Sequence, residues 1–163
     1  MVTATIHRGP YLAIQKDASP GLVFLRQFLT ASDSLSTDDH KVLCNQLHPD
    51  ATFTINNNPA ITLDQLLPML AMRSTKVSKF GHDVHTAWDI AEDDGGRTLM
   101  YESTSFTVFK GDPESVEARV NEFGVIELSR CSGGELKATK LRTYMDPAPV
   151  SARARLAMGM MGQ

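Results

Sequence analysis

The stretch FGHDVHTAWDI at residues 80–90 decides the fold, because the hydrophobic period of the chain changes here from that of a helix to that of a strand. Apolar residues recur at every second position along much of it, which is typical of a β-strand with one buried face. The Asp-Asp-Gly-Gly sequence at residues 93–96 follows and predicts a hairpin turn. One face of the predicted strand carries Phe80, His82, Val84, Trp88 and Ile90, and the other carries Asp83, His85 and Asp89.

Three more strands are predicted downstream, and each is joined to the next by a short turn. They cover residues 97–110, 115–130 and 135–145, with glycine-containing turns at residues 111–113 and 132–134. Long strands joined in this way form an antiparallel meander, in which each strand pairs with the one before it. The second half of the chain therefore predicts one sheet.

Helical spacing of apolar residues dominates the first half of the chain. Ser19 and Pro20 predict a helix start, and apolar residues then recur at helical spacing for about four turns. A second helix is capped at residues 36–39 and ends at Pro49, a short strand covers residues 50–55, and residues 62–65 have the capping-box pattern of a third helix. Helices followed by strands give the α+β class. We expect these helices to pack on the concave face of a curved antiparallel sheet.

The length of 163 residues fits a single domain with one core. We expect a leader at residues 1–18, the α+β domain at residues 19–150 and a tail at residues 151–163. The tail carries Met158, Met160 and Met161, a spacing that suits an adaptable lid over a pocket or a partner contact. A frayed terminus is the alternative.

Charge and composition exclude several classes of partner. The formal net charge is −3 and no Lys/Arg cluster lies on any one element, which argues against nucleic acid. No stretch approaches the roughly 20 apolar residues that cross a membrane, and the first 20 residues lack the apolar run of a signal peptide. Cys44 and Cys131 are too few for a disulfide framework and lack metal-ligand spacing. Two free thiols in a reducing compartment predict a cytoplasmic protein.

Two segments carry a resemblance to a known family. Residues 48–53, HPDATF, enter the first predicted strand, and residues 134–147 form the last strand and end in Tyr-Met-Asp-Pro. Both segments, and the element order over residues 20–150, resemble the nuclear transport factor two-like superfamily, also called SnoaL-like. The resemblance implies a sheet curled into a cone (an α+β barrel) whose wide end is a pocket, and homodimers formed through the outer sheet face. It also implies the activities of its members, which include isomerases, cyclases, dehydratases, epoxide hydrolases and non-catalytic adaptors.

Polar residues that interrupt an apolar strand face are the candidates for chemistry, because a pocket wall is mostly apolar. Glu122 is the only charge on the face that it shares with Val120, Ile126 and Leu128. If that face points inward, desolvation makes the carboxyl usable as a general acid or base, whereas near the open rim it would be solvated. His82 lies in an apolar run and is either a proton shuttle or a histidine hydrogen-bonded in the core.

Further candidates lie on the strand at residues 97–110. Alignment with epoxide-hydrolase members puts the Tyr101 face inward, where the phenol would donate a hydrogen bond to a developing oxyanion and Ser103 and Ser105 would orient the substrate. A satisfied core tyrosine is the alternative. The same alignment places Ser103, Ser105 and Thr143 where those hydrolases need two carboxylates and an arginine, so epoxide hydrolysis by that mechanism is not expected. Asn57 matches a water-positioning asparagine, or is simply a turn residue.

Two arginines and a tryptophan complete the candidates. Arg26 flanks the apolar stripe of the first helix, and Arg73 lies near the end of the third. Either arginine would reach over the pocket to hold a carbonyl or enolate oxygen, unless its charged end extends into solvent. Trp88 shares the predicted inward face of residues 80–90 and is expected to contact substrate.

The residues and the resemblance together predict an enzyme that needs no cofactor. We expect an isomerase or cyclase, or a dehydratase, that rearranges a polycyclic, polyketide, terpenoid or alkaloid-type intermediate of secondary metabolism. Glu122 would move the proton, and Tyr101 with Arg26 or His82 would stabilise oxyanion charge. The sequence contains no phosphate-binding loop, zinc spacing or dinucleotide fingerprint, so no metal or cofactor is expected. A non-catalytic small-molecule carrier or protein adaptor is the alternative, and it predicts a pocket whose polar groups are scattered or mutually satisfied.

Overall fold

The computed structural model describes residues 3–160 and confirms the α+β class. None of the helices in this range is long and apolar enough to cross a membrane. In chain order the elements are β1 (Ala4–Arg8), the 3-10 helix η1 (Tyr11–Ala13), α1 (Pro20–Asp33), α2 (Thr37–Asn45), β2 (Leu47–Ile55), β3 (Ile61–Thr62), α3 (Leu63–Lys76), β4 (Val77–Ala91), β5 (Arg97–Phe109), β6 (Ala118–Arg130), β7 (Leu136–Met145) and α4 (Ala148–Met160).

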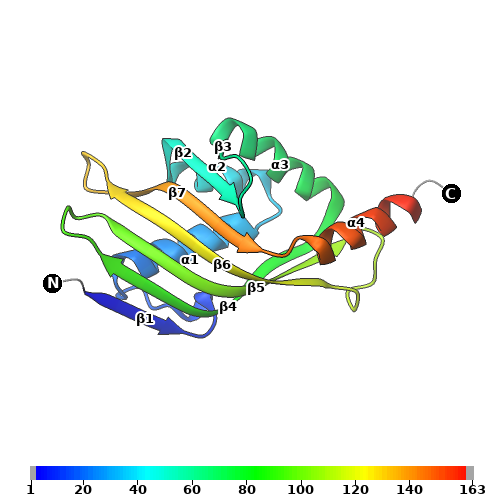
Figure 1. The fold of residues 1–163 in the computed structure, drawn as a ribbon, viewed down its shortest axis with the longest axis horizontal. Coiled ribbons are helices and arrows are strands. Elements are labelled where there is room, and N and C mark those ends of the chain that lie inside the picture. The colour runs from blue at the N-terminus through cyan, green and yellow to red at the C-terminus, as the bar shows by residue number, and fades with distance from the viewer. Residues whose placement is uncertain (1–2, 161–163) are drawn as a thin grey trace.

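The strands form one open sheet in the order β1-β4-β5-β6-β7-β2-β3, so the described residues do not close into a barrel. The antiparallel meander from β4 to β7 is confirmed. The sheet as a whole is mixed rather than antiparallel, because β2 pairs with β7 in parallel. Figure 1 shows the long twisted strands with α1, α2 and α3 gathered on one side of them.

The core lies between these helices and the facing side of the sheet. Leu25 and Leu29 of α1 are fully buried against Leu99 of β5 and Ile126 of β6. Burial of such aliphatic side chains stabilises the fold by roughly 1.5–3 kcal/mol each. The buried stripe on α1 and the alternating burial on β5 and β6 therefore fix which sheet face lines the interior.

Helix starts follow the predicted caps at α2 and α3. The Ser36 side chain accepts a hydrogen bond from the backbone N–H of Asp38, and Thr62 with Gln65 forms the capping box. Helix α1 is different, because the side chain of Ser19 caps nothing. Its first turn is capped from the sheet, where Asp89 Oδ2 accepts a hydrogen bond from Gly21 N at 2.9 Å.

Strand β4 contains a bulge that the sequence did not reveal. Pairing with β5 shifts by one residue between Val84 and Thr86, so the residues that follow are turned to the opposite faces. Asp89 therefore points inward and is fully buried. Trp88 lies on the other face, next to Ile6 of β1 in the pairing register. The prediction that Trp88 and Ile90 share the face of His82 was wrong for this reason.

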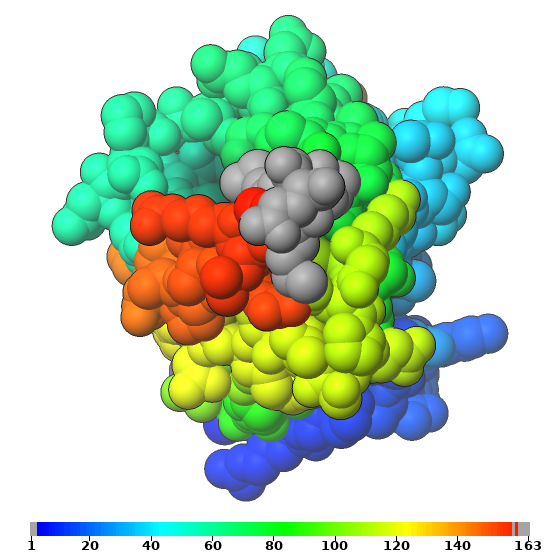
Figure 2. All heavy atoms as spheres, turned by 90° about the vertical axis from the view of Figure 1, so that its right-hand side faces the viewer, coloured from blue at the N-terminus to red at the C-terminus, as the bar shows by residue number. Residues whose placement is uncertain are grey.

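Both ends of the described chain carry elements that showed no clear period. Residues 4–8 of the predicted leader form the edge strand β1, and Tyr11 and Ile14 are buried in the core. The tail forms α4, which is held to the β5–β6 turn by hydrogen bonds from Arg153 to Asp112. Figure 2 shows α4 in orange-red lying across this end of the molecule, beside the yellow-green β5–β6 turn.

The prediction of a lid concerns the methionines of the tail, which lie mostly outside the described part of the structure. The side chains of Met158 and Met160, and the whole of Met161, lie outside the described part of the molecule. Among the described side chains of α4, none lines the pocket, although Met145 just before the helix does.

Candidate active site

A pocket of about 370 Å³ lies between the sheet and helices α1, α2 and α3. Its size is that of a small-molecule site. Most of its wall is apolar and comes from Phe28, Leu29, Phe53, Leu66, Leu70, Phe80, Ile126 and Leu141. The ionisable side chains in the wall are Arg73, His82, Tyr101, Glu122 and Arg142.

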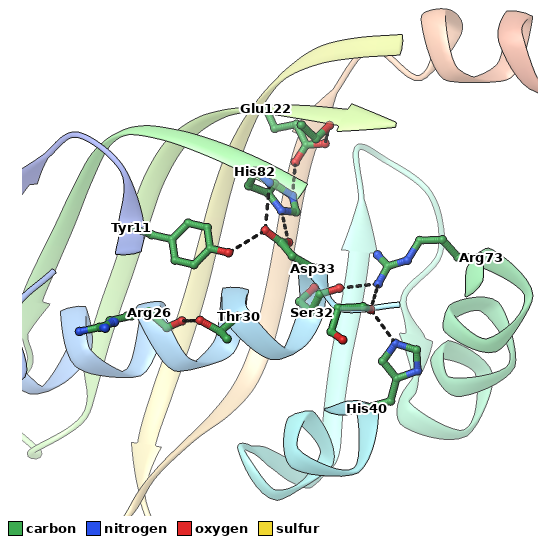
Figure 3. Close-up of polar contacts among 11 residues, drawn as sticks. Tyr11, Arg26, Thr30, Ser32, Asp33, His40, Arg73, His82 and Glu122 are labelled. Atoms are coloured by element: carbon green, nitrogen blue, oxygen red, sulfur yellow. Dashed lines mark hydrogen bonds and ion pairs between the residues drawn. The ribbon is translucent and has the colours of Figure 1, made fainter. Parts of the chain in front are cut away.

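His82 lies between two carboxylates at the inner wall of this pocket (Figure 3). Its Nδ1 is 2.6 Å from Asp33 Oδ1, and its Nε2 is 3.2 Å from Glu122 Oε2. The backbone N–H of His82 also donates to Asp33 Oδ2 at 2.9 Å. The side chains of all three are nearly buried, with exposed fractions of 9%, 11% and 8% for His82, Asp33 and Glu122. We call Asp33, His82 and Glu122 the acid–base array.

The imidazole of this array is positively charged at neutral pH. Burial alone would lower the pKa of His82, but the hydrogen bonds to Asp33 and Glu122 and the charges of these carboxylates outweigh it and raise the pKa to about 9. Each ring nitrogen therefore donates to a carboxylate. A protonated imidazole so placed is a ready hydrogen-bond donor and proton source beside the pocket.

The unfolding free energy is expected to fall as the pH rises from about 6.5 to about 9, because the folded protein keeps a proton on His82 that the unfolded chain releases. The stabilisation is complete below the unfolded pKa and disappears as the pH passes the folded pKa, with a slope of at most about 1.4 kcal/mol per pH unit. Urea denaturation at several pH values measures this slope. It should vanish in His82→Gln and persist in His85→Gln, whose histidine is exposed on the same strand. Equal slopes in the two variants would contradict the assignment.

Tyr101 of β5 brings a phenol into the pocket without a hydrogen bond to any described residue. Burial and the nearby charges of Glu122 and Asp33 raise its pKa, so the phenol keeps its proton. Its ring lies over Gly124 of the neighbouring strand, where any side chain would overlap it. The absence of a side chain at Gly124 therefore leaves the space that the Tyr101 ring occupies.

Glu122 is oriented by a hydroxyl as well as by the imidazole. Ser105 Oγ donates to Glu122 Oε1 at 2.5 Å. Ser103, directly opposite Glu122 in the pairing register, is buried, and its Oγ has no partner among residues 3–160. Both serines share the inward face of β5 with Tyr101, as the resemblance to epoxide-hydrolase members implied.

Some of the predicted site residues line the pocket, and the others lie elsewhere. Arg73 and Thr143 line the pocket with Glu122, His82 and Tyr101. Arg26 lies away from it along α1 (Figure 3), where its Nη1 donates to Ile14 O at 2.8 Å. Asn57 is exposed in the β2–β3 turn, and the neighbouring Asn58 lines the pocket instead. Neither Ser103 nor Trp88 is among the lining residues.

Sequence reasoning missed Asp33, which belongs to the array, and Tyr11, which donates a hydrogen bond to it. Tyr11 Oη donates to Asp33 Oδ2 at 3.1 Å from a segment that showed no period. Asp33 follows Leu29 by four residues and so continues the buried stripe of α1. A carboxylate in line with a buried stripe is the signal that identifies it. Over residues 3–160 no group of three His, Cys, Asp or Glu side chains is arranged to hold a metal ion.

Comparison with known proteins places the fold. No protein-family model matches the sequence, and no curated protein matches it either. An NTF2-like protein with a cystatin-like fold from Novosphingobium aromaticivorans superposes with a TM-score of 0.58, covering 80% of this chain and 82% of its own, at 14% identity. This chain has the nuclear transport factor two-like fold. The fold expected from residues 48–53 and 134–147 is thereby confirmed.

Other structures with the nuclear transport factor two-like fold are named for activities. A ketosteroid isomerase-like protein from Erwinia carotovora atroseptica has a TM-score of 0.60, covering 81% of this chain and 98% of its own, at 10% identity. The BvnE pinacolase from Penicillium brevicompactum has a TM-score of 0.62, covering 86% and 95%, at 9% identity. At these identities the likeness establishes the fold, so chemistry has to be argued from the pocket of this chain.

Proposed function

We propose that this chain is an isomerase or cyclase that rearranges a small organic molecule by general acid–base catalysis without a cofactor. The observation that carries the proposal is the buried array of Asp33, His82 and Glu122, of which His82 and Glu122 line one apolar pocket together with the unbonded phenol of Tyr101. Perturbed ionisable groups that converge in a pocket are typical of catalytic sites. A dehydratase would use the same groups with loss of water.

In the proposed reaction the Glu122 carboxylate takes a proton from a carbon next to a carbonyl group of the substrate. Tyr101 donates a hydrogen bond to the carbonyl oxygen, where negative charge develops. The positively charged His82 also stabilises the negative charge on that oxygen. The sequence left this role open between His82 and Arg26. Glu122 then returns the proton to another carbon, so the substrate is rearranged with no net gain or loss of atoms.

The charges around the pocket support an uncharged substrate. The two carboxylates of Asp33 and Glu122 are balanced by the charges of His82 and Arg73, and Arg142 is paired with Glu127 at 2.7 Å. A charged ligand would lose its hydration in this apolar pocket without meeting an unpaired counter-charge. A mainly apolar cyclic ketone, as in polyketide- or terpenoid-type intermediates of secondary metabolism, fits the lining better than a carboxylate or an ammonium-bearing alkaloid.

Hydrogen exchange tests the proposal without knowledge of the natural substrate. A panel of uncharged mono-, bi- and tricyclic ketones, including 2-decalone, is incubated with the protein in D2O, and deuterium at the carbons next to the carbonyl is followed by NMR. We expect exchange above the buffer rate for at least the bicyclic ketones. The absence of exchange for ketones that bind would overturn the enzymatic proposal.

One observation favours a non-catalytic carrier as the second candidate. Both ring nitrogens of His82 and both oxygens of Glu122 already have partners inside the protein, which is what a mutually satisfied pocket predicts. The phenol of Tyr101 and the Nε atoms of Arg73 and Arg142, which have no hydrogen-bond partner among the described residues, depart from this pattern. A carrier would bind the same ketones and leave their exchange rate at that of the buffer.

We further propose a homodimer formed through the outer sheet face, in a cytoplasmic protein with free thiols at Cys44 and Cys131. An apolar row crosses this face from β1 to β6, because Ile6, Trp88, Met100 and Val125 are successive partners in the register. Ile6 is half exposed, and an exposed apolar row of this kind suits an interface between copies. Light scattering is expected to give the dimer mass for the wild type and the monomer mass for Met100→Glu. A monomeric wild type would refute the pairing.

A further inference from the structure

The last turn of α1 is held by side chains from two other helices. Arg73 of α3 donates through Nη2 to the carbonyl of Ser32 and, at 3.4 Å, to that of Ser34. His40 of α2 places its Nε2 3.1 Å from the same Ser34 carbonyl. The last carbonyls of a helix have no partner within the helix, so these contacts fix where the helix ends (Figure 3).

Asp33 lies between the two carbonyls that Arg73 holds. Its side chain points the other way, toward Tyr11 and His82, and accepts a hydrogen bond from each. The backbone of Asp33 has little freedom while Ser32 and Ser34 are both anchored. The position of the carboxylate next to His82 Nδ1 therefore depends on Arg73, although Arg73 makes no hydrogen bond with Asp33 or His82.

Arg73 is itself fixed by the wall of the pocket. Its guanidinium carbon lies 4.1 Å from the centre of the Phe80 ring, and the Phe80 ring meets the His82 ring edge-on at 5.3 Å. A lysine can also form a cation–π contact, but only the planar guanidinium of arginine stacks on a ring while donating several hydrogen bonds. Burial lowers the pKa of Arg73 and the charge of Asp33 opposes that shift. Because Arg73 contacts both the Phe80 ring and the two carbonyls, its side chain is held in one position and is not free to move toward a substrate.

We propose that Arg73 is a positioning residue, which holds the Asp33 carboxylate beside His82 Nδ1 through the carbonyls of Ser32 and Ser34. The catalytic meaning of this role rests on the proposed function. The role itself does not, because the charge of His82 is measurable without any substrate.

The sign of the effect separates positioning from simple charge. The titratable groups around His82 are Asp33 from α1 and Glu122 from β6, which bond to it, and Tyr101 from β5 and Arg73 from α3, which line the same pocket, with Tyr11 acting through Asp33. Removal of a positive charge near His82 would raise the pKa of the imidazole. Loss of the Asp33 hydrogen bond would lower it. A variant without Arg73 therefore shifts the pKa downward if Arg73 positions Asp33, and upward if only its charge matters.

The experiment is an NMR titration of the His82 ring in the full chain, with its signal assigned from a His82→Gln spectrum. In Arg73→Met we expect the pKa of His82 to fall by about one unit. Arg26→Met is the matched control, because Arg26 also donates to a backbone carbonyl but lies away from the pocket. It should leave the pKa unchanged. An unchanged or raised pKa in folded Arg73→Met overturns the proposal.

A double-mutant cycle tests whether the effect passes through Asp33. In an Asp33→Asn background the further change Arg73→Met is expected to shift the pKa of His82 no more than Arg26→Met does. An additional downward shift of similar size would show that Arg73 acts by another route. If Arg73→Met fails to fold, Arg73→Lys replaces it, because a single ammonium group cannot bridge both carbonyls while stacked on Phe80, and a smaller downward shift is expected. Failure of the ketone exchange assay would leave these results standing.

Discussion

Replacing Glu122 by glutamine is expected to lower the rate of ketone exchange by about 10²- to 10⁴-fold, the usual contribution of a positioned general base. The amide has nearly the shape of the carboxylate but cannot take a proton. Its oxygen can still accept from Ser105 or His82, so the packing of the pocket should survive. Exchange rates measured in D2O, together with circular dichroism spectra, check both expectations.

Glu102→Gln is the matched control for this experiment. Glu102 lies on the neighbouring strand, β5, and its side chain is exposed on the face opposite Tyr101. It does not line the pocket, so its loss should leave the exchange rate within about twofold of the wild type. A Glu122→Gln protein that exchanges ketones at the wild-type rate would remove Glu122 from the reaction and return the pocket to the carrier hypothesis.

Strands and turns from residue 77 onward were predictable because each is set by local chemistry. The turns at residues 93–96, 111–113 and 132–134 each contain a glycine at positive φ, which few other residues adopt. Between them the alternation of burial is regular on β5 and β6. This alternation placed Glu122 on one face with Val120, Ile126 and Leu128, whereas the inward direction of Tyr101 was predicted from the family resemblance, because neither face of its strand was clearly apolar. The pairing of the two strands brings both side chains to one pocket.

The partners of His82 were not predictable in the same way. Asp33 is 49 residues from His82 in sequence, and Tyr11 is 22 residues from Asp33. No local pattern encodes which helix end meets which strand, because that depends on how α1 packs across the sheet. The side chains of Arg26 and Arg73 illustrate the limit. Both flank apolar helix faces, and both helices reach the pocket, but only the side chain of Arg73 lines it.

The bulge in β4 accounts for the remaining error. One extra residue near His85 leaves the residues before it in the predicted register and reverses those after it. His82 therefore stays at the pocket, whereas Trp88 and Asp89 exchange faces. No glycine or proline marks the bulge, since the residues around it are Val84, His85 and Thr86.

Because the bulge in β4 turns Asp89 into the core, replacing Asp89 is expected to have the largest effect on the unfolding free energy. Its carboxylate is 0% exposed, accepts from Gly21 N at the start of α1 and pairs with Arg97 Nε at 2.5 Å. Asp89→Ala would leave a buried guanidinium and a helix N–H without partners, so a loss of about 3–5 kcal/mol in unfolding free energy is expected.

Asp83→Ala is the matched control on the same strand, because its pair with Arg119 is 53% exposed at the aspartate and is worth less than about 1 kcal/mol. Urea denaturation of both variants measures the difference. Similar midpoints would mean that the contact between β4 and the first turn of α1 does not hold the helix on the sheet, and the placement of Asp33 at its far end would need another cause.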